Sequence, residues 1–315
     1  MTDWVIAGAA FVVTVLVMPV VIVIARRTGV VDHPGALKHQ SVPVPYLGGV
    51  AVLAGAAVGA IAGRPEVLVP LGAATVLGVA DDRFDLPPLI RLCGQLAIGA
   101  MVVMVSPVHL PTTLVVPLLL AITVVLINGA NLLDGLDMLA AGVCAVAAAG
   151  FAVLLGGSGR DLAVALALAL LGFLLYNRPP ARVYLGDGGS YLLGTALTVL
   201  LAMTWAPGVA THTGVAALAL VALPAAEVAC TVVRRLRAGR SVLAGDRGHL
   251  YDLLVARGWT PVVASLAYIG AGIILSAAAV GVAQVSSVAA ALVLDAAAAV
   301  GLMTAAAATG ALGLR

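Results

Sequence analysis

The sequence predicts an all-α integral membrane protein. Hydrophobic residues make up 63% of the 315 residues and charged residues only 10%, whereas a soluble domain carries roughly 25% charged residues. The mean hydropathy is +1.17. The apolar runs approach the ~20 residues that a helix needs to cross a bilayer, and they lack the alternation of barrel strands. We therefore expect a bundle of transmembrane helices.

The predicted spans follow one another from the N-terminus with short connections. We expect eleven, at residues 4–25, 46–63, 66–80, 89–106, 112–128, 138–156, 161–177, 190–206, 209–231, 260–280 and 285–308. The first run follows Asp3 instead of a basic segment and is longer than the apolar part of a signal peptide. It is expected to be an uncleaved span with the N-terminus outside. Residues 1–315 are expected to form a single transmembrane domain without a soluble part.

The basic residues are concentrated on one side of this predicted topology. The loops opposite the N-terminus are 26–45, 81–88, 129–137, 178–189 and 232–259, together with the C-terminal tail. These loops and the adjoining span ends hold all of the 16 Lys and Arg residues except Arg64 and Arg160. The positive-inside rule makes this face cytoplasmic. The sequence predicts a multi-pass protein of the inner or plasma membrane with a cytoplasmic site, and a net charge of +2 gives no reason to expect a nucleic-acid partner.

The first acidic cluster, Asp81-Asp82-Arg83-Phe84-Asp85, lies at the cytoplasmic end of the third predicted span. If the helix continues through it, Asp85 shares a helical face with both Asp81 and Asp82, and like charges at such spacing repel. They persist only if a cation, a basic partner or a proton relieves the repulsion. A solvated helix end is the alternative interpretation.

A second cluster, at the end of the fifth predicted span, combines amides and carboxylates. Asn128, Asn131, Asp134 and Asp137 follow one another at intervals of three residues, which places neighbours on one helical face. Oxygen ligands without cysteines or clustered histidines favour a hard cation such as Mg²⁺, whose shell is completed by phosphate oxygens and water. Together with the arginines on this face, the pattern indicates a phosphate substrate held by magnesium.

A third polar segment runs from Asn177 to Ser190 between two apolar runs. It presents Arg182, Tyr184 and Asp187 beside glycines whose backbone can approach a ligand closely. The NH groups at the start of the following helix could bind phosphate oxygens. We expect this turn to join the two acidic clusters in one site.

Five segments resemble, in order, the polyprenyl-phosphate N-acetylhexosamine-1-phosphate transferase family, which includes the phospho-MurNAc-pentapeptide translocase. They are residues 32–49, 81–86, 128–137, 177–190 and 246–250. The resemblance implies transfer of a sugar 1-phosphate from a UDP-sugar to a membrane polyprenyl phosphate, with release of UMP, as the initiating step of a cell-envelope glycan. It implies Mg²⁺ as cofactor, with Mn²⁺ as a substitute. A homodimer is compatible with it, and the sequence leaves the oligomeric state open.

The resemblance also assigns roles to individual residues. It implies that Asp187 and Asn131 ligate the metal ion. It implies catalytic roles for Asp81, Asp82, Asp134 and His249, with Asp81 and Asp82 beside the lipid phosphate. The substrate-binding residues that it implies are Lys38, Asp137, Asn128, Asn177, Arg182, Tyr184 and Arg247, with Tyr184 stacked on the uracil.

The expected chemistry is direct attack by the lipid phosphate, in preference to a covalent aspartyl intermediate. A phosphate monoester has a second pKa of ~6, so the acceptor is mostly a dianion at neutral pH and hardly needs a strong base. Asp81 is expected to accept any residual proton.

One departure from the family pattern leaves the donor open. Where relatives carry further histidines after the first, this chain reads His249-Leu250-Tyr251-Asp252. GlcNAc is the default sugar, and a phospho-MurNAc-pentapeptide or another UDP-sugar is the alternative. A transporter or flippase is the alternative from another class, but transporters place carboxylates near the bilayer midplane. Glu227 and Asp295 lie inside predicted spans and receive no role.

Overall fold

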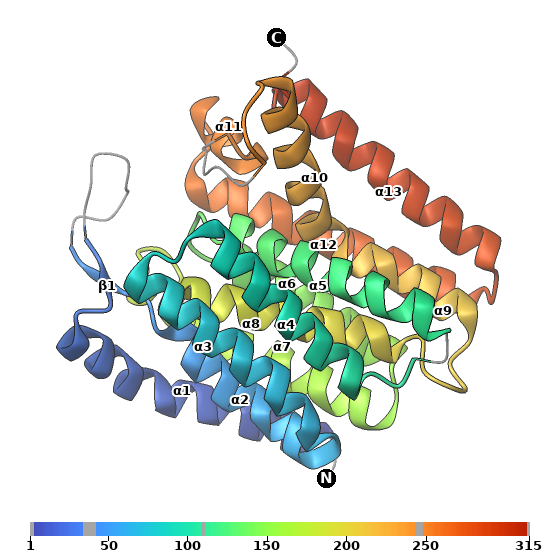
Figure 1. The fold of residues 1–315 in the computed structure, drawn as a ribbon, viewed down its shortest axis with the longest axis horizontal. Helices are drawn as coiled ribbons and strands as arrows, with labels where there is room; N and C mark the ends of the chain where they lie inside the picture. The colour runs from blue at the N-terminus through green and yellow to red at the C-terminus, as the bar shows by residue number, and fades with distance from the viewer. Residues whose placement is uncertain (1–2, 34–41, 109–110, 243–247, 314–315) are drawn as a thin grey trace.

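The computed structural model describes residues 3–33, 42–108, 111–242 and 248–313, and almost all of its regular structure is helical (Figure 1). The α-helices are α1 (Asp3–Thr28), α2 (Gly48–Gly63), α3 (Leu68–Phe84), α4 (Pro88–Val105), α5 (Thr112–Leu133), α6 (Leu139–Leu154), α7 (Gly157–Asn177), α8 (Gly186–Met203), α9 (Thr211–Ala216), α10 (Ala222–Arg237), α11 (Leu250–Ala256), α12 (Pro261–Gln284) and α13 (Val288–Thr309). Two short 3-10 helices, η1 (Pro65–Val67) and η2 (Ala217–Val221), precede α3 and α10. The predicted all-α class is confirmed.

Seven helical segments of the described chain are long and apolar enough to cross a bilayer. They are α1, α4, α5, α7, the segment Thr211–Arg237, α12 and α13. The helices α2 and α6 are equally apolar but have 16 residues each. The chain is therefore a multi-pass membrane protein. The count of eleven spans and the cytoplasmic orientation of the basic face stay predictions.

The span predicted at 209–231 is not one continuous α-helix. It is divided into α9, η2 and α10, and Pro224 lies in the first turn of α10. Proline lacks the backbone N–H that would continue the preceding helix, but it fits the first turn of a new one. The break turns α10 toward α11 and the end of α13 (Figure 1).

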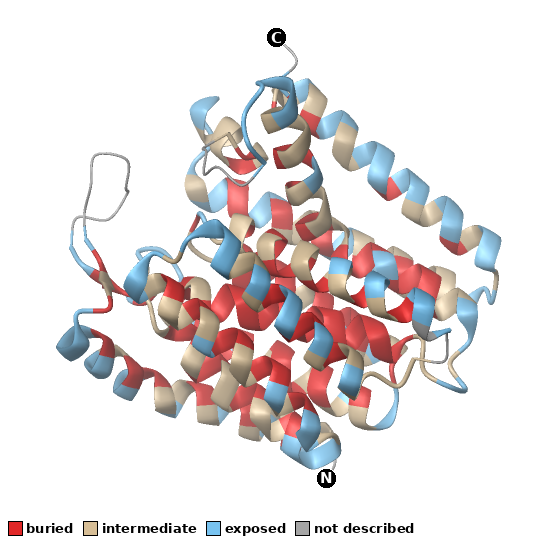
Figure 2. Cartoon of the chain, in the orientation of Figure 1, coloured by how far each residue is buried: buried red, intermediate tan, exposed pale blue. Residues whose placement is uncertain are grey.

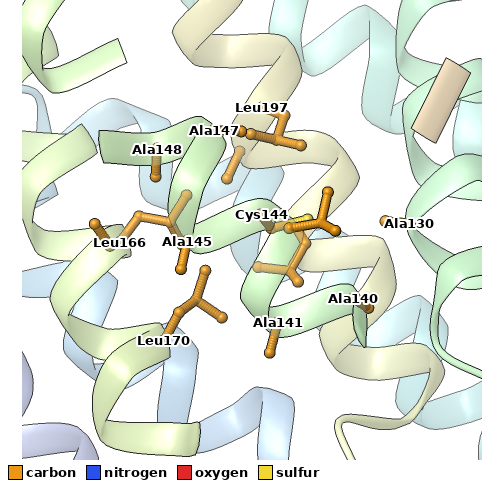
Figure 3. Packing of buried hydrophobic residues seen from close by; sticks show 14 of the residues in the cluster. Ala130, Ala140, Ala141, Cys144, Ala145, Ala147, Ala148, Leu166, Leu170 and Leu197 are labelled. Atoms are coloured by element: carbon orange, nitrogen blue, oxygen red, sulfur yellow. The ribbon is translucent and has the colours of Figure 1, made fainter. Parts of the chain in front are cut away.

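The buried centre of the bundle is formed by α6, α7 and α8 (Figure 2). Figure 3 shows how Ala141, Cys144, Ala145 and Ala148 of α6 lie among larger side chains of the neighbouring helices. Lipid tails are as apolar as leucine, so helices in a membrane associate mainly through close packing, which small residues permit. In α13, by contrast, only 6% of the apolar window is buried. The buried centre thus includes α8, whose first turn carries Asp187.

A short hairpin holds the connection between α7 and α8 in place. The strands β1 (Val31–Asp32) and β2 (Val44–Pro45) pair in antiparallel fashion, with Val31 opposite Pro45. The Tyr184 N–H donates to the Pro45 carbonyl over 2.8 Å, and the Gly48 N–H donates to the Tyr184 carbonyl over 3.0 Å. The hairpin was not predicted from the sequence, since strands of two residues have no detectable period.

Candidate active site

Asp82 in the last turn of α3 joins α3 to the first turn of α8. Its carboxylate accepts hydrogen bonds from the backbone N–H groups of Asp187, at 3.1 Å, and Gly188, at 3.3 Å. The first N–H groups of a helix have no partner within it, and they favour a negative charge. Gly78 makes this contact feasible, because a Cβ added there would lie 2.2 Å from the Asp187 carbonyl oxygen.

The end of α5 reaches the same turn. The Asn131 side-chain amide donates to Asp187 Oδ1 over 2.5 Å and to Ser190 Oγ over 3.1 Å. Burial raises the pKa of Asp134, which directly follows α5 and lies close enough to Asp187 and Asp82 for their charges to raise it further. The three polar segments singled out in the sequence therefore meet at one end of the bundle. We call Asp81, Asp82, Asp134 and Asp187 the acidic cluster.

Asp81 is buried and has three hydrogen-bond donors. The Tyr191 hydroxyl donates to Oδ2 over 2.7 Å, Arg91 Nη1 lies 3.4 Å from the same oxygen, and the Leu86 N–H donates to Oδ1 over 3.0 Å. Sequence reasoning assigned no role to Tyr191 or Arg91. A signal was present for Tyr191, which lies one helical turn after Asp187 and so on the same face.

Asp85 does not share the environment of Asp81 and Asp82, so the expected crowding of three carboxylates does not occur. The helix continues to Phe84 and Asp85 is its C-cap, with φ of 49°. Its side chain is exposed, whereas Asp81 is buried and Asp82 half-buried. A left-handed residue ends the helix there, and short polar side chains tolerate that conformation.

Burial and mutual repulsion give the acidic cluster an affinity for positive charge. Burial, then repulsion by Asp82 and Asp81, raises the pKa of Asp187 to about 8. Burial is also the main cause that raises the pKa of Asp82 to about 6. The pKa of Asp134 lies well above its usual range because of burial and repulsion by Asp187 and Asp82. A cation at this position would relieve the repulsion.

The available ligands fit a hard cation held by few protein groups. Within the described residues, no three His, Cys, Asp or Glu side chains converge into a metal cage. Magnesium is commonly held by one or two carboxylates, with phosphate oxygens and water completing an octahedron. Asp187 and Asn131 offer such oxygen ligands, although the amide of Asn131 turns its nitrogen toward Asp187. With a cation bound there, the amide would turn its acceptor oxygen toward the ion in place of its donor nitrogen.

Two of the predicted substrate-binding residues hold loops together. Asn177 is buried, accepts a hydrogen bond from the Met138 N–H over 2.8 Å and donates to the Val183 carbonyl over 3.0 Å. Asp137 accepts from the Ala181 N–H over 3.1 Å. These contacts fix the loop that carries Tyr184 against the loop that follows Asp134.

Tyr184 and Arg182 occupy different surroundings. Tyr184 is half-buried, its ring centroid lies 6.4 Å from that of Tyr46, and burial, with repulsion by Asp137, raises its pKa to about 12. Arg182 is exposed, donates to the Leu175 carbonyl over 2.8 Å and lies over the Tyr176 ring at 4.8 Å. Tyr184 can therefore offer a half-buried ring face to a ligand, whereas the Arg182 guanidinium is already engaged by Leu175 and Tyr176.

A cavity of about 300 Å³ lies beside the acidic cluster, between α4, α5, α8 and α10. Its polar lining includes Arg91, Asn128, Asn131, Tyr191 and Arg235, and the remainder is largely apolar, with valines of α5 and α10. Asn128 donates to Gln95 Oε1 over 2.8 Å in this wall. A cavity with both linings suits a ligand that has an apolar chain and an anionic group.

The hydrogen-bond partner of the His249 ring is Glu227, which is not part of the acidic cluster. Its Nδ1 lies 3.3 Å from Glu227 Oε2, and its ring stacks on Tyr251 with centroids 5.3 Å apart. The residues that follow in this segment have structural contacts: the Tyr251 hydroxyl donates to the Leu132 carbonyl over 2.9 Å, and Asp252 accepts from the His249 N–H over 3.3 Å. The predicted site residues Lys38 and Arg247 lie outside the described residues.

Comparison with known proteins agrees with this geometry. Residues 66–205, which include the ends of α3 and α5 and the start of α8, match the family described as glycosyl transferase family 4. The chain is 31% identical to the decaprenyl-phosphate N-acetylglucosaminephosphotransferase of Mycolicibacterium smegmatis, over 75% of this chain and 71% of the relative. It is 29% identical to the probable undecaprenyl-phosphate N-acetylglucosaminyl 1-phosphate transferase of Bacillus subtilis, over 79% and 77%.

A third similar protein comes from another organism. The chain is 29% identical to the undecaprenyl-phosphate alpha-N-acetylglucosaminyl 1-phosphate transferase of Salmonella typhi, over 75% of this chain and 72% of the relative. The names of these three relatives agree on a polyprenyl phosphate and an N-acetylglucosaminyl phosphate group. Each relative is matched over more than two thirds of its length, so the similarity is not limited to one motif.

Proposed function

We propose that this chain, which belongs to glycosyl transferase family 4, transfers N-acetylglucosamine 1-phosphate from UDP-GlcNAc to a polyprenyl phosphate and releases UMP. This proposal rests on one observation: α3 and α5 end where α8 begins, and this brings together Asp82, Asn131, Asp134 and Asp187. The choice of sugar is supported by the relatives, whose names specify transfer of an N-acetylglucosaminyl phosphate group. No observation favours a phospho-MurNAc-pentapeptide donor or a transporter.

The cavity beside the acidic cluster is proposed to admit the lipid acceptor. Its apolar lining would hold the first isoprene units, and Arg91, one third exposed and part of the same lining, would meet the phosphate. Guanidinium groups suit phosphate because they donate several hydrogen bonds in a fixed plane. The Asp81 carboxylate, which accepts a hydrogen bond from the Tyr191 hydroxyl, would also accept one from Arg91 and keep it in place.

The proposed reaction is an in-line displacement at the sugar-linked phosphorus of the donor. An oxygen of the lipid phosphate forms a bond to that phosphorus while the bond to the bridging oxygen breaks, and UMP leaves with the negative charge. The acceptor is mostly a dianion at neutral pH, so no strong base is required. The Asp187 and Gly188 N–H groups at the start of α8 already donate to Asp82, so the nearby arginines would stabilise charge on the transferring group.

Asp187 and Asn131 are proposed to hold Mg²⁺, with Mn²⁺ as a substitute. When bound, the ion would neutralise the donor diphosphate and stabilise the charge that gathers on UMP. Asp82 would position Asp187 for this role, because its carboxylate accepts hydrogen bonds from the backbone of the turn that carries Asp187. The concentration of basic residues on this face supports a cytoplasmic active site, where UDP-sugars would be available.

The proposal is tested by UMP release from the purified full-length protein. A panel of UDP-sugars is offered with undecaprenyl or decaprenyl phosphate, in the presence of Mg²⁺, Mn²⁺ or EDTA. We expect UMP only when lipid acceptor and divalent cation are both present, with the highest kcat/KM for UDP-GlcNAc. Absence of UMP with every donor would overturn the proposed function, and undiminished release in EDTA would remove the metal.

Tyr184 provides a separate test of where the nucleotide binds. If its ring stacks on the uracil, Tyr184→Ala loses the stacking energy, which for a base on an aromatic ring is about 1–3 kcal/mol. We expect KM for the UDP-sugar to rise roughly 5- to 150-fold, while KM for the lipid stays the same. Tyr184→Phe keeps a ring and is the matched control. Equal KM values in the alanine and phenylalanine variants would place the base elsewhere.

A further inference from the structure

Glu227 and His249 form a buried polar pair apart from the acidic cluster. The two residues are 4% and 5% exposed, on α10 and at the start of α11. One carboxylate oxygen of Glu227, Oε2, lies 3.3 Å from His249 Nδ1. The other, Oε1, accepts a hydrogen bond from the Tyr268 hydroxyl of α12. The proposed reaction uses neither Glu227 nor Tyr268.

Packing alone does not require a carboxylate at position 227. A cavity of about 170 Å³ lies beside it between α10, α11, α12 and α13, and its other walls are mostly apolar, with Leu223, Leu250 and Leu254 among them. A leucine or methionine would suit such surroundings at no desolvation cost, whereas a buried carboxylate needs partners. In an apolar environment its hydrogen bonds to those partners are strengthened.

The contacts define how the His249 ring is held. A carboxylate oxygen accepts hydrogen bonds, so the ring nitrogen facing Glu227, Nδ1, carries a proton and Nε2 is the free nitrogen of the neutral ring. The Tyr251 ring lies almost parallel to the imidazole, at 11°, which restricts its rotation. Tyr251 is itself fixed, because its hydroxyl donates to the Leu132 carbonyl.

The second ring nitrogen remains available. Nε2 has no hydrogen bond to any residue within the described ranges. In the same part of the chain, the only fully buried side-chain nitrogen or oxygen atoms without a partner are the two carboxylate oxygens of Asp295. Nε2 is not one of them, so it keeps some access to solvent although the residue is almost completely buried.

We propose that Glu227 is a positioning residue for His249, keeping Nδ1 protonated so that Nε2 is presented to the sugar or diphosphate oxygens of the donor. This rests on the proposed function, because it requires a UDP-sugar to reach His249. The carboxylate also stabilises the ring when Nε2 gains a proton, so Nε2–H can then donate to a phosphate oxygen. Tyr268 restrains Glu227 from the other side.

The experiment combines histidine spectra with kinetics on the full-length protein. In protein labelled with ¹⁵N-histidine, His249→Gln identifies the signals of residue 249. We expect the wild type to show a protonated Nδ1 and an unprotonated Nε2, and Glu227→Leu to lose this preference. The matched control is Tyr268→Phe, which removes a hydrogen bond from the same carboxylate but keeps the contact with His249, so the preference persists.

Kinetic measurements distinguish a positioning role of Glu227 from a purely structural one. Losing the carboxylate that orients a metal-ligating histidine typically costs about 10- to 100-fold in activity. We expect a decrease of the same order in kcat for Glu227→Leu, with KM for the lipid unchanged. Tyr268→Phe should show a smaller decrease. Because both changes act through one ring, Glu227→Leu combined with His249→Gln should be no slower than His249→Gln alone.

Two results would overturn the inference: an unchanged tautomer in Glu227→Leu, or losses that multiply in the double variant. If Glu227→Leu does not fold, Glu227→Gln keeps the shape without the charge and enters the same double variant. If the wild type releases no UMP, the proposed function fails. The role of Glu227 is then tested by the response of the His249 Nε2 signal to titration with UDP-GlcNAc. A shift of the Nε2 signal in wild type and not in the Glu227 variant supports positioning, and no shift in wild type refutes it.

Discussion

Asp187→Asn is expected to lose roughly 1,000-fold in kcat for UMP release, the upper range for removal of one group that stabilises transition-state charge. The substitution removes the negative charge that would hold the cation, but the side chain keeps an oxygen for the hydrogen bond from Asn131. The variant should fold normally. Its melting temperature without metal should equal or exceed that of the wild type, because burial and repulsion by Asp82 and Asp81 already disfavour the charged form of Asp187.

The matched control for this prediction is Asp85→Asn. It is the same chemical change in the neighbouring acidic segment, but Asp85 is exposed and ends α3 with a positive φ, which asparagine adopts readily. We expect its UMP release to remain within about twofold of the wild type, because surface substitutions away from the site have small effects. Full activity of Asp187→Asn, or equal losses in both variants, would contradict a specific role for Asp187.

The second large effect is expected at Gly78. A Cβ at this position would lie 2.2 Å from the Asp187 carbonyl oxygen and 2.4 Å from the Gly188 nitrogen. These are backbone atoms, so no side chain can move aside, and α3 and α8 must separate. Overpacking of this kind typically costs about 1–3 kcal/mol. Gly78→Ala should therefore lower the melting temperature and, by displacing Asp82 from the α8 terminus, nearly abolish UMP release.

Gly72→Ala, on the same helix, controls for helix propensity. Apart from the adjoining backbone of α3, no atom of the described residues lies within 4 Å of a Cβ added at Gly72, and alanine favours a helix over glycine by about 1 kcal/mol. This variant should melt at the same temperature as the wild type or higher and keep its activity. A melting temperature and activity of Gly78→Ala like those of Gly72→Ala would show that α3 does not need its close approach to α8.

Several features of the site were accessible from the sequence because they are local. Asp81 and Asp82 follow one apolar run, Asn131 and Asp134 end another, and Asp187 precedes a third. A carboxylate at the end of a membrane helix needs a partner wherever that helix packs. The grouping of these residues could thus be predicted without any contact being known.

Other features depended on contacts between distant segments. The family resemblance predicts that Asn177 and Asp137 bind substrate, which stays a prediction. In the fold their side chains also hold backbone groups of neighbouring loops, which no local pattern indicates. Tyr191 was assigned no role because, in sequence, it is one more apolar residue of a helix. Its contact with Asp81 joins residues 110 positions apart. The helical period places Tyr191 on the face of Asp187, but it does not show which distant residue the hydroxyl meets.

The sequence by itself determined that this is a helical membrane protein whose polar residues gather at helix ends. Both follow from the cost of exposing backbone and charge to hydrocarbon, which acts on each segment separately. Only the tertiary structure decided which ends meet: Asp82 with the first turn of α8, and Glu227 with His249. The physical reason is that close packing between helices depends on shape at single positions, such as Gly78, and hydropathy carries no information about that shape.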